Sequence, residues 1–286
     1  MQEISIVWLK RDLRLSDHQS IAEAIRAGFP VLLMYCFEPS LIAAPQSDDR
    51  HWRFVWESLQ EMQTRLKALK TSVAIFHMEV QEVFQYLKAE FDIQAVYSHL
   101  ETGIHITFER DKQMSAFFKE IGISWYEYAQ QGVSRGLIDR SRWTNSWYEF
   151  ANAPIQNPDW DNASFIELSD SFMKNLPQRE ISEVWKKPNP SMQPGGESKG
   201  RLYLKSFLEK RVKNYSRHIS KPELSRKGCS RLSPYLAWGC ISLREVYQSS
   251  EQKAKSGFQA RNFTNFQSRL RWHCHFIQKF EMECRM

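Results

Sequence analysis

One short segment of the chain combines residues that could hold a phosphate group. Ser230 and Ser233 place small hydroxyl groups on either side of Arg231, and Pro234 follows at a position suited to the first turn of a helix. Hydroxyls, a guanidinium and a helix N-terminus all donate hydrogen bonds to phosphate oxygens, so together they are typical of an anion site. On the residues alone, an ordinary helix cap beside a surface arginine is the simpler interpretation.

A second group of residues could be taken for metal ligands: His273, Cys274, His275 and Cys284. Their spacing is poor for zinc, because adjacent helical residues point about 100° apart and do not converge on one ion. We therefore expect no metal site.

The elements that must position these residues begin with an alternating pattern. Over residues 1–130, short apolar runs alternate with amphipathic segments, which predicts a parallel sheet covered by helices on both faces. The expected fold class is a doubly wound α/β domain with a five-stranded parallel sheet, although no glycine-rich phosphate fingerprint follows the first strand. We expect strands at residues 4–9, 31–37, 72–76, 94–97 and 123–126, and helices at 17–27, 51–69, 80–87 and 106–118.

The remainder of the chain changes in character twice. Residues 131–198 contain six prolines and no clear periodicity, which is typical of a linker between domains. Beyond it, apolar residues such as Leu204, Phe207 and Leu208 recur at helical spacing. We expect residues 1–130 to form the α/β domain, 131–198 the linker, and 199–286 part of an all-helical domain.

Positive charge is concentrated in the predicted helical part. Residues 199–286 hold 19 Lys and Arg against 6 Asp and Glu, a net charge of +13, whereas residues 1–130 carry −5 and residues 131–198 carry −2. This density favours a polyanionic partner, such as nucleic acid or a dinucleotide. A solvated basic helix surface is the alternative.

Composition also bears on location. No apolar run reaches the roughly 18 residues of a membrane span, and the N-terminus MQEISIVWLK lacks the pattern of a signal peptide. The five cysteines are scattered, which argues for a reducing compartment and against a disulfide framework. We expect a cytoplasmic protein that has no membrane part and acts as a monomer.

Five segments, in order along the chain, resemble the photolyase/cryptochrome family. They are WLKRDLRLSDH at residues 8–18, GVSRG at 132–136, PGGES at 194–198, SRLSPYLAWGCIS at 230–242 and RLRWHCHFIQKFE at 269–281. The resemblance implies an N-terminal α/β domain that often holds an antenna, a long linker, and a helical FAD-binding domain.

The resemblance also implies a function. It indicates a deoxyribodipyrimidine photolyase, a carbon–carbon lyase that uses light and reduced FAD to split pyrimidine dimers in UV-damaged DNA. The alternative is a cryptochrome-type blue-light photoreceptor with the same fold and cofactor. The antenna would be methenyltetrahydrofolate or a deazaflavin. A third, more distant reading is a small-ligand α/β binding domain with an unrelated helical tail.

Motif matching implies roles for individual residues but identifies no catalytic side chain. Trp272 would pack against the lesion, Lys210, Arg211 and Lys213 would contact DNA phosphates, and Glu109 would contact the antenna. Core packing is the alternative for Phe266 and Trp272, and a solvated helix charge for Glu109. The expected cofactor-binding residues are Tyr215, Cys229, Ser230, Arg231, Leu232, Ser233, Phe266, Arg269 and His273.

The sequence departs from the family pattern at three of these positions. Phe266 and Arg269 stand where many repair enzymes carry Trp and Glu, and Cys229 stands where Thr is common. These departures leave room for a photoreceptor or for another lesion.

The match to the family ends at Met286, within the flavin domain. We therefore expect the chain alone to purify colourless and without photorepair. We also expect it to expose apolar side chains of the helical part, namely Leu202, Phe207, Phe263, Phe276 and Phe280.

Overall fold

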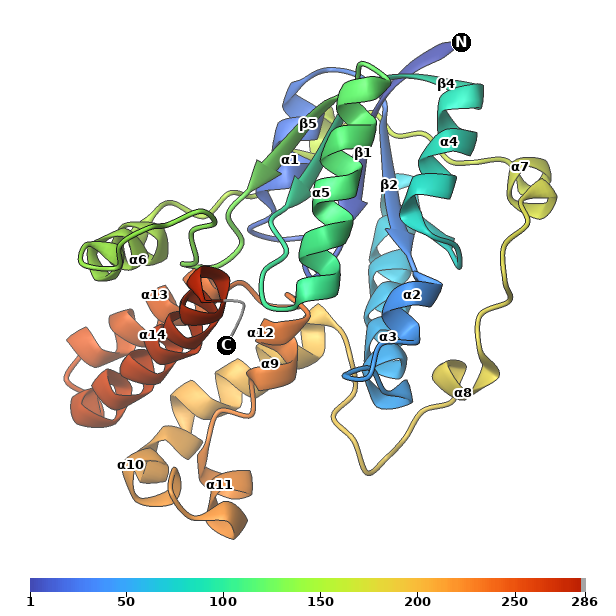
Figure 1. Ribbon diagram of the computed structural model, residues 1–286. Coiled ribbons are helices and arrows are strands. Elements are labelled where there is room, and N and C mark those ends of the chain that lie inside the picture. Colours follow the sequence, from blue (N-terminus) through green and yellow to red (C-terminus); the bar gives the residue numbers. More distant parts are fainter. Residues whose placement is uncertain (284–286) are drawn as a thin grey trace. The chain divides into compact units, whose positions relative to one another are not determined.

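The computed structural model describes residues 1–283 and divides the chain into two compact units (Figure 1). The first, here called the α/β unit, comprises residues 1–128 and 156–196. The second, the helical unit, comprises residues 129–155 and the chain from residue 197 onward. The segment expected to be a linker is thus divided between the two units, and each unit is described by itself.

Five parallel strands form the sheet of the α/β unit, in the order β3-β2-β1-β4-β5. The strand order reverses between β1 and β4, which confirms the doubly wound fold expected from the sequence. The bounds are β1 (Gln2–Leu9), β2 (Val31–Cys36), β3 (Val73–Phe76), β4 (Phe91–His99) and β5 (Ser124–Tyr128).

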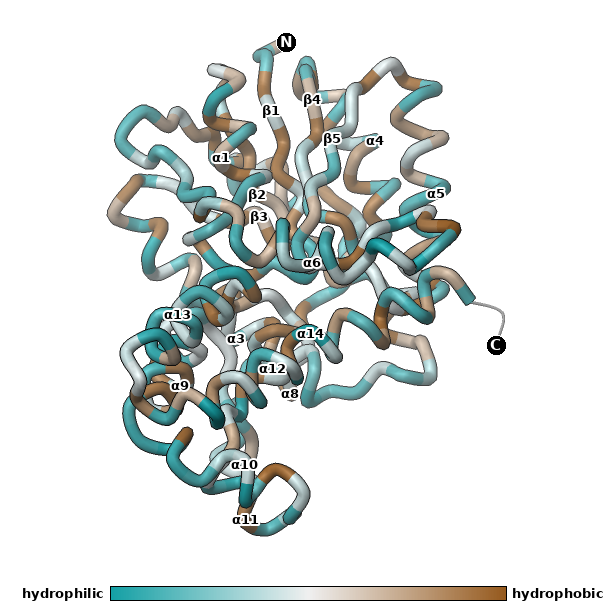
Figure 2. The backbone as a smooth tube through the Cα atoms, turned by 90° about the vertical axis from the view of Figure 1, so that its left-hand side faces the viewer, coloured by the Kyte–Doolittle hydropathy of each residue, from teal (hydrophilic) through white to brown (hydrophobic). Residues whose placement is uncertain are grey.

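The core of the α/β unit explains why β1 is apolar on both faces. Ile6 and Trp8 pack in one cluster with Phe84 and Phe118 from the helices, while Val7 is buried on the opposite face. Figure 2 shows hydrophobic residues along β1. The helices of this unit are α1 (Gln19–Arg26), α2 (Pro39–Ile42), α3 (Asp49–Leu66), α4 (Val80–Glu90), α5 (His105–Glu120), α7 (Asp170–Asn175) and α8 (Glu183–Lys186), with short 3-10 turns at Lys67–Leu69 and Trp160–Asn162.

The described residues of the helical unit form helices and turns around an aromatic core. The ring of Phe207 lies 4.6 Å from that of Phe266 and 6.4 Å from that of Phe263. The helices are α6 (Trp143–Asn152), α9 (Glu197–Glu209), α10 (Tyr215–His218), α11 (Pro222–Gly228), α12 (Ser233–Ala237), α13 (Leu243–Lys255) and α14 (Ala260–Met282), with a 3-10 turn at Arg211–Asn214.

Helix α6 lies within the segment that we expected to be irregular, so that expectation was wrong here. Trp143, Trp147 and Ala151 recur every four residues and are all buried. The ring of Trp147 contacts that of Tyr247 on α13 at 5.3 Å, and Gln248 Nε2 donates to the Ala151 carbonyl at 3.0 Å. The six prolines that follow α6 within residues 131–198 obscured this helical spacing in the sequence.

The GVSRG segment is fastened to helix α14. Gln278, which is fully buried, accepts a hydrogen bond from Ser134 N at 2.7 Å and donates one to Ser134 O at 2.9 Å. Arg135 lies 3.7 Å from Glu281 one turn further along α14. The contacts of Gln278 with Ser134 and of Glu281 with Arg135 fix the rotation of α14 about its axis, because a buried amide is costly to leave unpaired.

The apolar residues of the helical unit divide into two groups. Leu202, Phe276 and Phe280 are more than half exposed, as expected. Phe207 and Phe263 are fully buried, and the expectation of exposure was wrong for them, because they pack against each other within the unit.

Two further expectations concern membranes and thiols. Within residues 1–283, every helix is too short or too polar to cross a bilayer. Cys36, Cys229, Cys240 and Cys274 are free thiols, and Cys284 lies outside the described residues.

Candidate functional site

The loop that joins α11 to α12 has an unusual backbone at its centre. Arg231 has a φ angle of 60°, in the left-handed region that residues other than glycine seldom adopt. Helix α12 begins at Ser233, whereas the sequence placed Ser233 at the cap and the helix one residue later. Leu232 takes the cap position, and Ser233 is exposed. A strained residue of this kind persists only where its surroundings hold it.

Arg211 supplies that support. Its guanidinium donates to the carbonyl oxygens of Tyr203 at 2.6 Å, of Ser230 at 3.2 Å and of Cys229, and its Nε donates to Ser206 Oγ at 3.0 Å. The half-buried guanidinium is thus used inside the helical unit. This arginine therefore holds the loop, and its expected contact with DNA phosphate stays a prediction.

A cavity of about 470 Å³ opens beside this loop. We call it the helical-unit cavity. It brings together all nine residues that the sequence assigned to a cofactor, although they come from three separate segments. Its lining consists of Tyr215, Ile219, Ser220, Ser225, Cys229, Ser230, Arg231, Leu232, Ser233, Leu236, Phe266, Arg269, Leu270 and His273.

Sequence reasoning missed the five other lining residues. Ser220 and Ser225 add hydroxyl groups, and Ile219, Leu236 and Leu270 add apolar surface. No spacing signal marks the two serines, because they reach the cavity only through the turn made by α10 and α11.

The chemistry of the helical-unit cavity suits an anion that has an apolar part. Arg231 and Arg269 are cations, and the lining has no carboxylate. Burial lowers the pKa of His273, so its ring is neutral at pH 7, and its Nε2 has no hydrogen-bond partner among residues 1–283. Burial raises the pKa of Tyr215 and keeps its phenol protonated.

Helix α14 supplies one wall of this cavity. Phe266, Arg269, Leu270 and His273 follow the spacing of a single helix face. Phe266 is 3% exposed and packs on Phe207, so core packing is part of its role.

Three predicted DNA contacts lie outside the cavity lining. Trp272 is 47% exposed, and the guanidinium of Arg269 lies 4.5 Å from the centre of its ring. Lys210 and Lys213 are exposed on either side of Arg211. Their contact with DNA stays a prediction.

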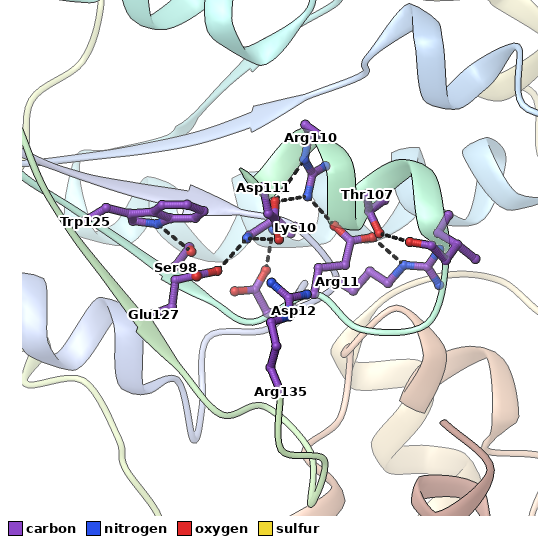
Figure 3. A network of polar contacts seen from close by, with 12 residues as sticks. Lys10, Arg11, Asp12, Ser98, Thr107, Arg110, Asp111, Trp125, Glu127 and Arg135 are labelled. Atoms are coloured by element: carbon purple, nitrogen blue, oxygen red, sulfur yellow. Dashed lines mark hydrogen bonds and ion pairs between the residues drawn. The ribbon is translucent and has the colours of Figure 1, made fainter. Parts of the chain in front are cut away.

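A buried charge network occupies the carboxyl ends of β1 and β4 in the α/β unit (Figure 3). Lys10 Nζ lies 3.4 Å from Asp111 Oδ2, 3.3 Å from Glu127 Oε1 and 4.5 Å from the centre of the Trp8 ring. Doubly wound sheets bind ligands at this switch in strand order. Here the side chains of the protein itself fill the position next to β1.

Arg110 extends the network. It pairs with Glu38 at 2.7 Å, Glu101 at 2.8 Å and Asp111 at 2.8 Å. Burial alone would raise the pKa of Glu101, but the charges of Arg110 and Arg11 outweigh it and lower that pKa to about 2. Burial raises the pKa of Glu38 to about 7 despite Arg110.

Asp12, His18 and His99 form a buried group whose ligand atoms lie within 4.8 Å of one another. His18 Nδ1 accepts a hydrogen bond from Ile21 N at 3.2 Å, so in the neutral ring the proton lies on Nε2, 3.3 Å from Asp12 Oδ2. His99 Nδ1 lies 2.8 Å from the same carboxylate oxygen. A ring nitrogen that carries a proton offers a metal no lone pair, so this geometry favours a hydrogen-bonded structural group.

Glu109, the predicted antenna contact, lies on α5. Its carboxylate is 40% exposed and pairs with Lys112 at 3.2 Å, one turn along the helix. It also lines a cavity of about 590 Å³ in the α/β unit. Contact with an antenna stays a prediction.

Comparison with known proteins agrees with this architecture. Residues 5–134 match the family model described as DNA photolyase. The chain is 24% identical over 275 residues to cryptochrome-2 of Arabidopsis thaliana, covering 88% of this chain and 44% of that protein. It is 23% identical over 286 residues to a deoxyribodipyrimidine photo-lyase of Synechococcus sp., covering 93% and 58%.

A solved structure shows the same fold. An archaeal photolyase from Sulfolobus tokodaii, whose crystal structure contains two FAD molecules, matches with a TM-score of 0.73 and 21% identity, covering 98% of this chain and 60% of that one. These matches support assignment of the chain to the photolyase/cryptochrome family, and both photolyases and cryptochromes are among the proteins to which it is similar. It spans about half the length of the curated relatives it matches.

Proposed function

We propose that the helical unit binds FAD and that the protein is a photolyase-like flavoprotein that repairs pyrimidine dimers in UV-damaged DNA. One observation carries the proposal: nine residues that family resemblance assigned to the cofactor converge on one cavity. When bound, reduced and excited by light, FAD supplies the electron that splits the dimer. The residues of this chain would bind FAD and the dimer and orient them.

The phosphate side of the cofactor would lie against the loop 229–233. Ser230 and Arg231 offer a hydroxyl and a guanidinium to the pyrophosphate, and Tyr215 adds a neutral phenol. Arg211 holds the carbonyl oxygens of Cys229 and Ser230, so the loop is already ordered before a ligand arrives.

The ring side of the cofactor would lie against α14. Phe266 offers an apolar surface, and the unpaired Nε2 of His273 offers a hydrogen bond to the polar edge of a flavin. Because the two hydrogen bonds between Gln278 and Ser134 fix this helix, the side chains of Phe266 and His273 keep their direction.

DNA binding would depend on exposed cations and on Trp272. The net charge of +13 over residues 199–286 favours phosphate contacts, for which exposed Lys210 and Lys213 are suited. Trp272, nearly half exposed, offers a face on which an extruded base could stack.

Arg269 favours keeping a cryptochrome-type photoreceptor as the second candidate. Its guanidinium is a permanent cation that can bind a carbonyl oxygen, but it is a poor proton donor, unlike the Glu of many repair enzymes. The antenna, monomeric state and cytoplasmic location stay predictions.

Light-driven repair distinguishes the two candidates. The protein, saturated with added FAD, would be reduced, mixed with an oligonucleotide carrying one thymine dimer, and illuminated or kept dark. Thymine that is restored in the illuminated sample and not in the dark sample supports the photolyase. Photoreduction of bound FAD without restored thymine supports the photoreceptor, and absence of FAD binding overturns both.

A further inference from the structure

The α/β unit contains a second cavity, for which the predicted antenna contact of Glu109 is so far the one assigned role. It measures about 590 Å³ and lies among the segment after β2 that contains Glu38 and Ser40, the start of α4 and one face of α5. We call it the α/β-unit cavity. Its volume falls within the roughly 300–1,000 Å³ typical of small-ligand sites. Four carboxylates line it, those of Glu38, Glu79, Glu82 and Glu109.

Glu38 points to a ligand because one of its oxygens is unpaired. The residue is 2% exposed, and its Oε1 accepts a hydrogen bond from Arg110 at 2.7 Å. Its Oε2 is buried and has no hydrogen-bond partner among residues 1–283. A buried carboxylate oxygen without a donor is costly, so a donor supplied by a ligand would be bound favourably.

The charges around the cavity decide whether that ligand is a cation or an anion. Arg110 is the cation in the lining, and its guanidinium also pairs with Glu101 and Asp111, which do not line the cavity. The N-terminus of α4 contributes a partial positive charge, which Glu82 in its first turn offsets. Lys112 pairs with Glu109, and Glu79 accepts hydrogen bonds from the uncharged Ser40. The charges of Glu38 and Glu79 therefore leave the cavity negative, which favours a cation.

The spacing of the carboxylates decides between a metal ion and a larger cation. Asp12, His18 and His99 form the group of converging ligand atoms found among the described residues, and the carboxylates of this cavity form no such group. Val80, Ile106 and Met114 add apolar surface to the lining. Carboxylates that do not converge, in a cavity that also has apolar surface, suit a chain that carries N–H donors at both ends.

We propose that the α/β-unit cavity binds a small organic cation, with a guanidinium or amidinium group on Glu38 Oε2 and a second cationic group toward Glu79 and Glu109. The methylene groups between them would lie against the apolar residues of the lining. The anionic tail of a folate would be repelled by the same carboxylates, so this site differs in chemistry from one for that antenna.

Calorimetric titration of the chain with agmatine tests the proposal, because agmatine carries a guanidinium and an ammonium on a short chain. We expect saturable binding, and binding about tenfold weaker for 4-guanidinobutyrate, which replaces the ammonium with a carboxylate. Absence of agmatine binding at millimolar concentration, or equal binding of the two probes, would overturn the proposal. So would displacement of agmatine by methenyltetrahydrofolate.

Glu38→Gln locates the site. It preserves the shape of the side chain and removes the charge, so agmatine should bind about tenfold more weakly or worse. Glu120→Gln, at an exposed position of α5 outside the cavity, is the matched control and should bind as the parent does. Unchanged affinity in folded Glu38→Gln contradicts the assignment.

A measurement on the parent chain covers the case in which Glu38→Gln does not fold. Burial raises the pKa of Glu38 to about 7, with Arg110 opposing it and Glu101 and Glu79 adding to it. A bound cation favours the ionised carboxylate, so binding at neutral pH should release a proton and tighten as the pH rises through about 7. Titration in two buffers of different ionisation enthalpy measures the proton, and its absence would contradict a contact with Glu38.

Discussion

The guanidinium of Arg211 lies 3.2 Å from the carbonyl oxygen of Ser230, and so ties the turn after α9 to the loop that lines the helical-unit cavity. The same guanidinium also bonds the carbonyl oxygens of Tyr203 and Cys229. One half-buried side chain thus holds three separate points of the backbone. Loss of this side chain should lower both the stability of the unit and its affinity for a ligand.

Arg211→Ala should destabilise the chain by about 2–3 kcal/mol, since several hydrogen bonds to a charged group are lost and carbonyl oxygens are left unpaired. Urea unfolding followed by circular dichroism measures the change. Lys210→Ala, at the exposed neighbouring position, is the control and should change stability by no more than about 0.5 kcal/mol. Equal effects of the two variants would mean that Arg211 does not hold the loop.

Arg231→Gly should separate backbone strain from cofactor binding. Glycine adopts a φ of 60° freely, so the variant should be as stable as the parent or more stable by about 1 kcal/mol. The guanidinium is lost, so FAD should bind about tenfold more weakly. Stability and FAD affinity that fall together would show that the arginine acts through folding alone. Lys227→Ala, outside the cavity, is the control for affinity.

Charge reversal at Lys210 and Lys213 should weaken DNA binding and flatten its dependence on salt. Each lost phosphate contact lowers the slope of log affinity against log salt by about 0.9. Binding of a dimer-containing duplex at several salt concentrations gives that slope. Reversal of Lys88 and Lys119, two exposed lysines of the α/β unit, serves as the control. The same slope in both double variants would exclude the helical-unit lysines as contacts.

Stability at acid pH should depend on Glu101. Its pKa is about 2 in the folded chain, below the ordinary value of 4.5, because Arg110 and Arg11 outweigh the effect of burial. The ionised form therefore stabilises the fold above about pH 4.5, and that contribution is lost as the pH falls toward 2. Glu101→Gln should cost about 3 kcal/mol at pH 6 and progressively less at lower pH. A cost that stays constant with pH would contradict the ion pairs as its cause.

The sheet was predictable from the sequence because its signal is local. A strand buried on both faces must be mostly apolar, as Ile4 to Leu9 are apart from Ser5, and this run can be recognised without knowing its neighbours. The residues assigned to a cofactor line one cavity for another reason: the family motif from which they were taken records which distant segments meet.

Arrangements that depend on tertiary packing were missed or misread. The hydrogen bonds of Arg211 to the loop were missed, because only the folded chain brings the carbonyl oxygens of Cys229 and Ser230 to it. Phe207 and Phe263 are 56 positions apart, and nothing local indicates that they bury each other. The unpaired oxygen of Glu38 likewise depends on where Arg110 lies.

Titration of the chain with FAD, followed by quenching of flavin fluorescence, tests the central claim most directly. We predict saturable binding that is weak enough for the flavin to be lost during purification. ADP should compete with FAD through the pyrophosphate site, and Arg231→Gly should weaken FAD binding about tenfold. Binding without saturation, or binding of equal strength in the parent and in Arg231→Gly, would contradict the assignment of the helical-unit cavity to FAD.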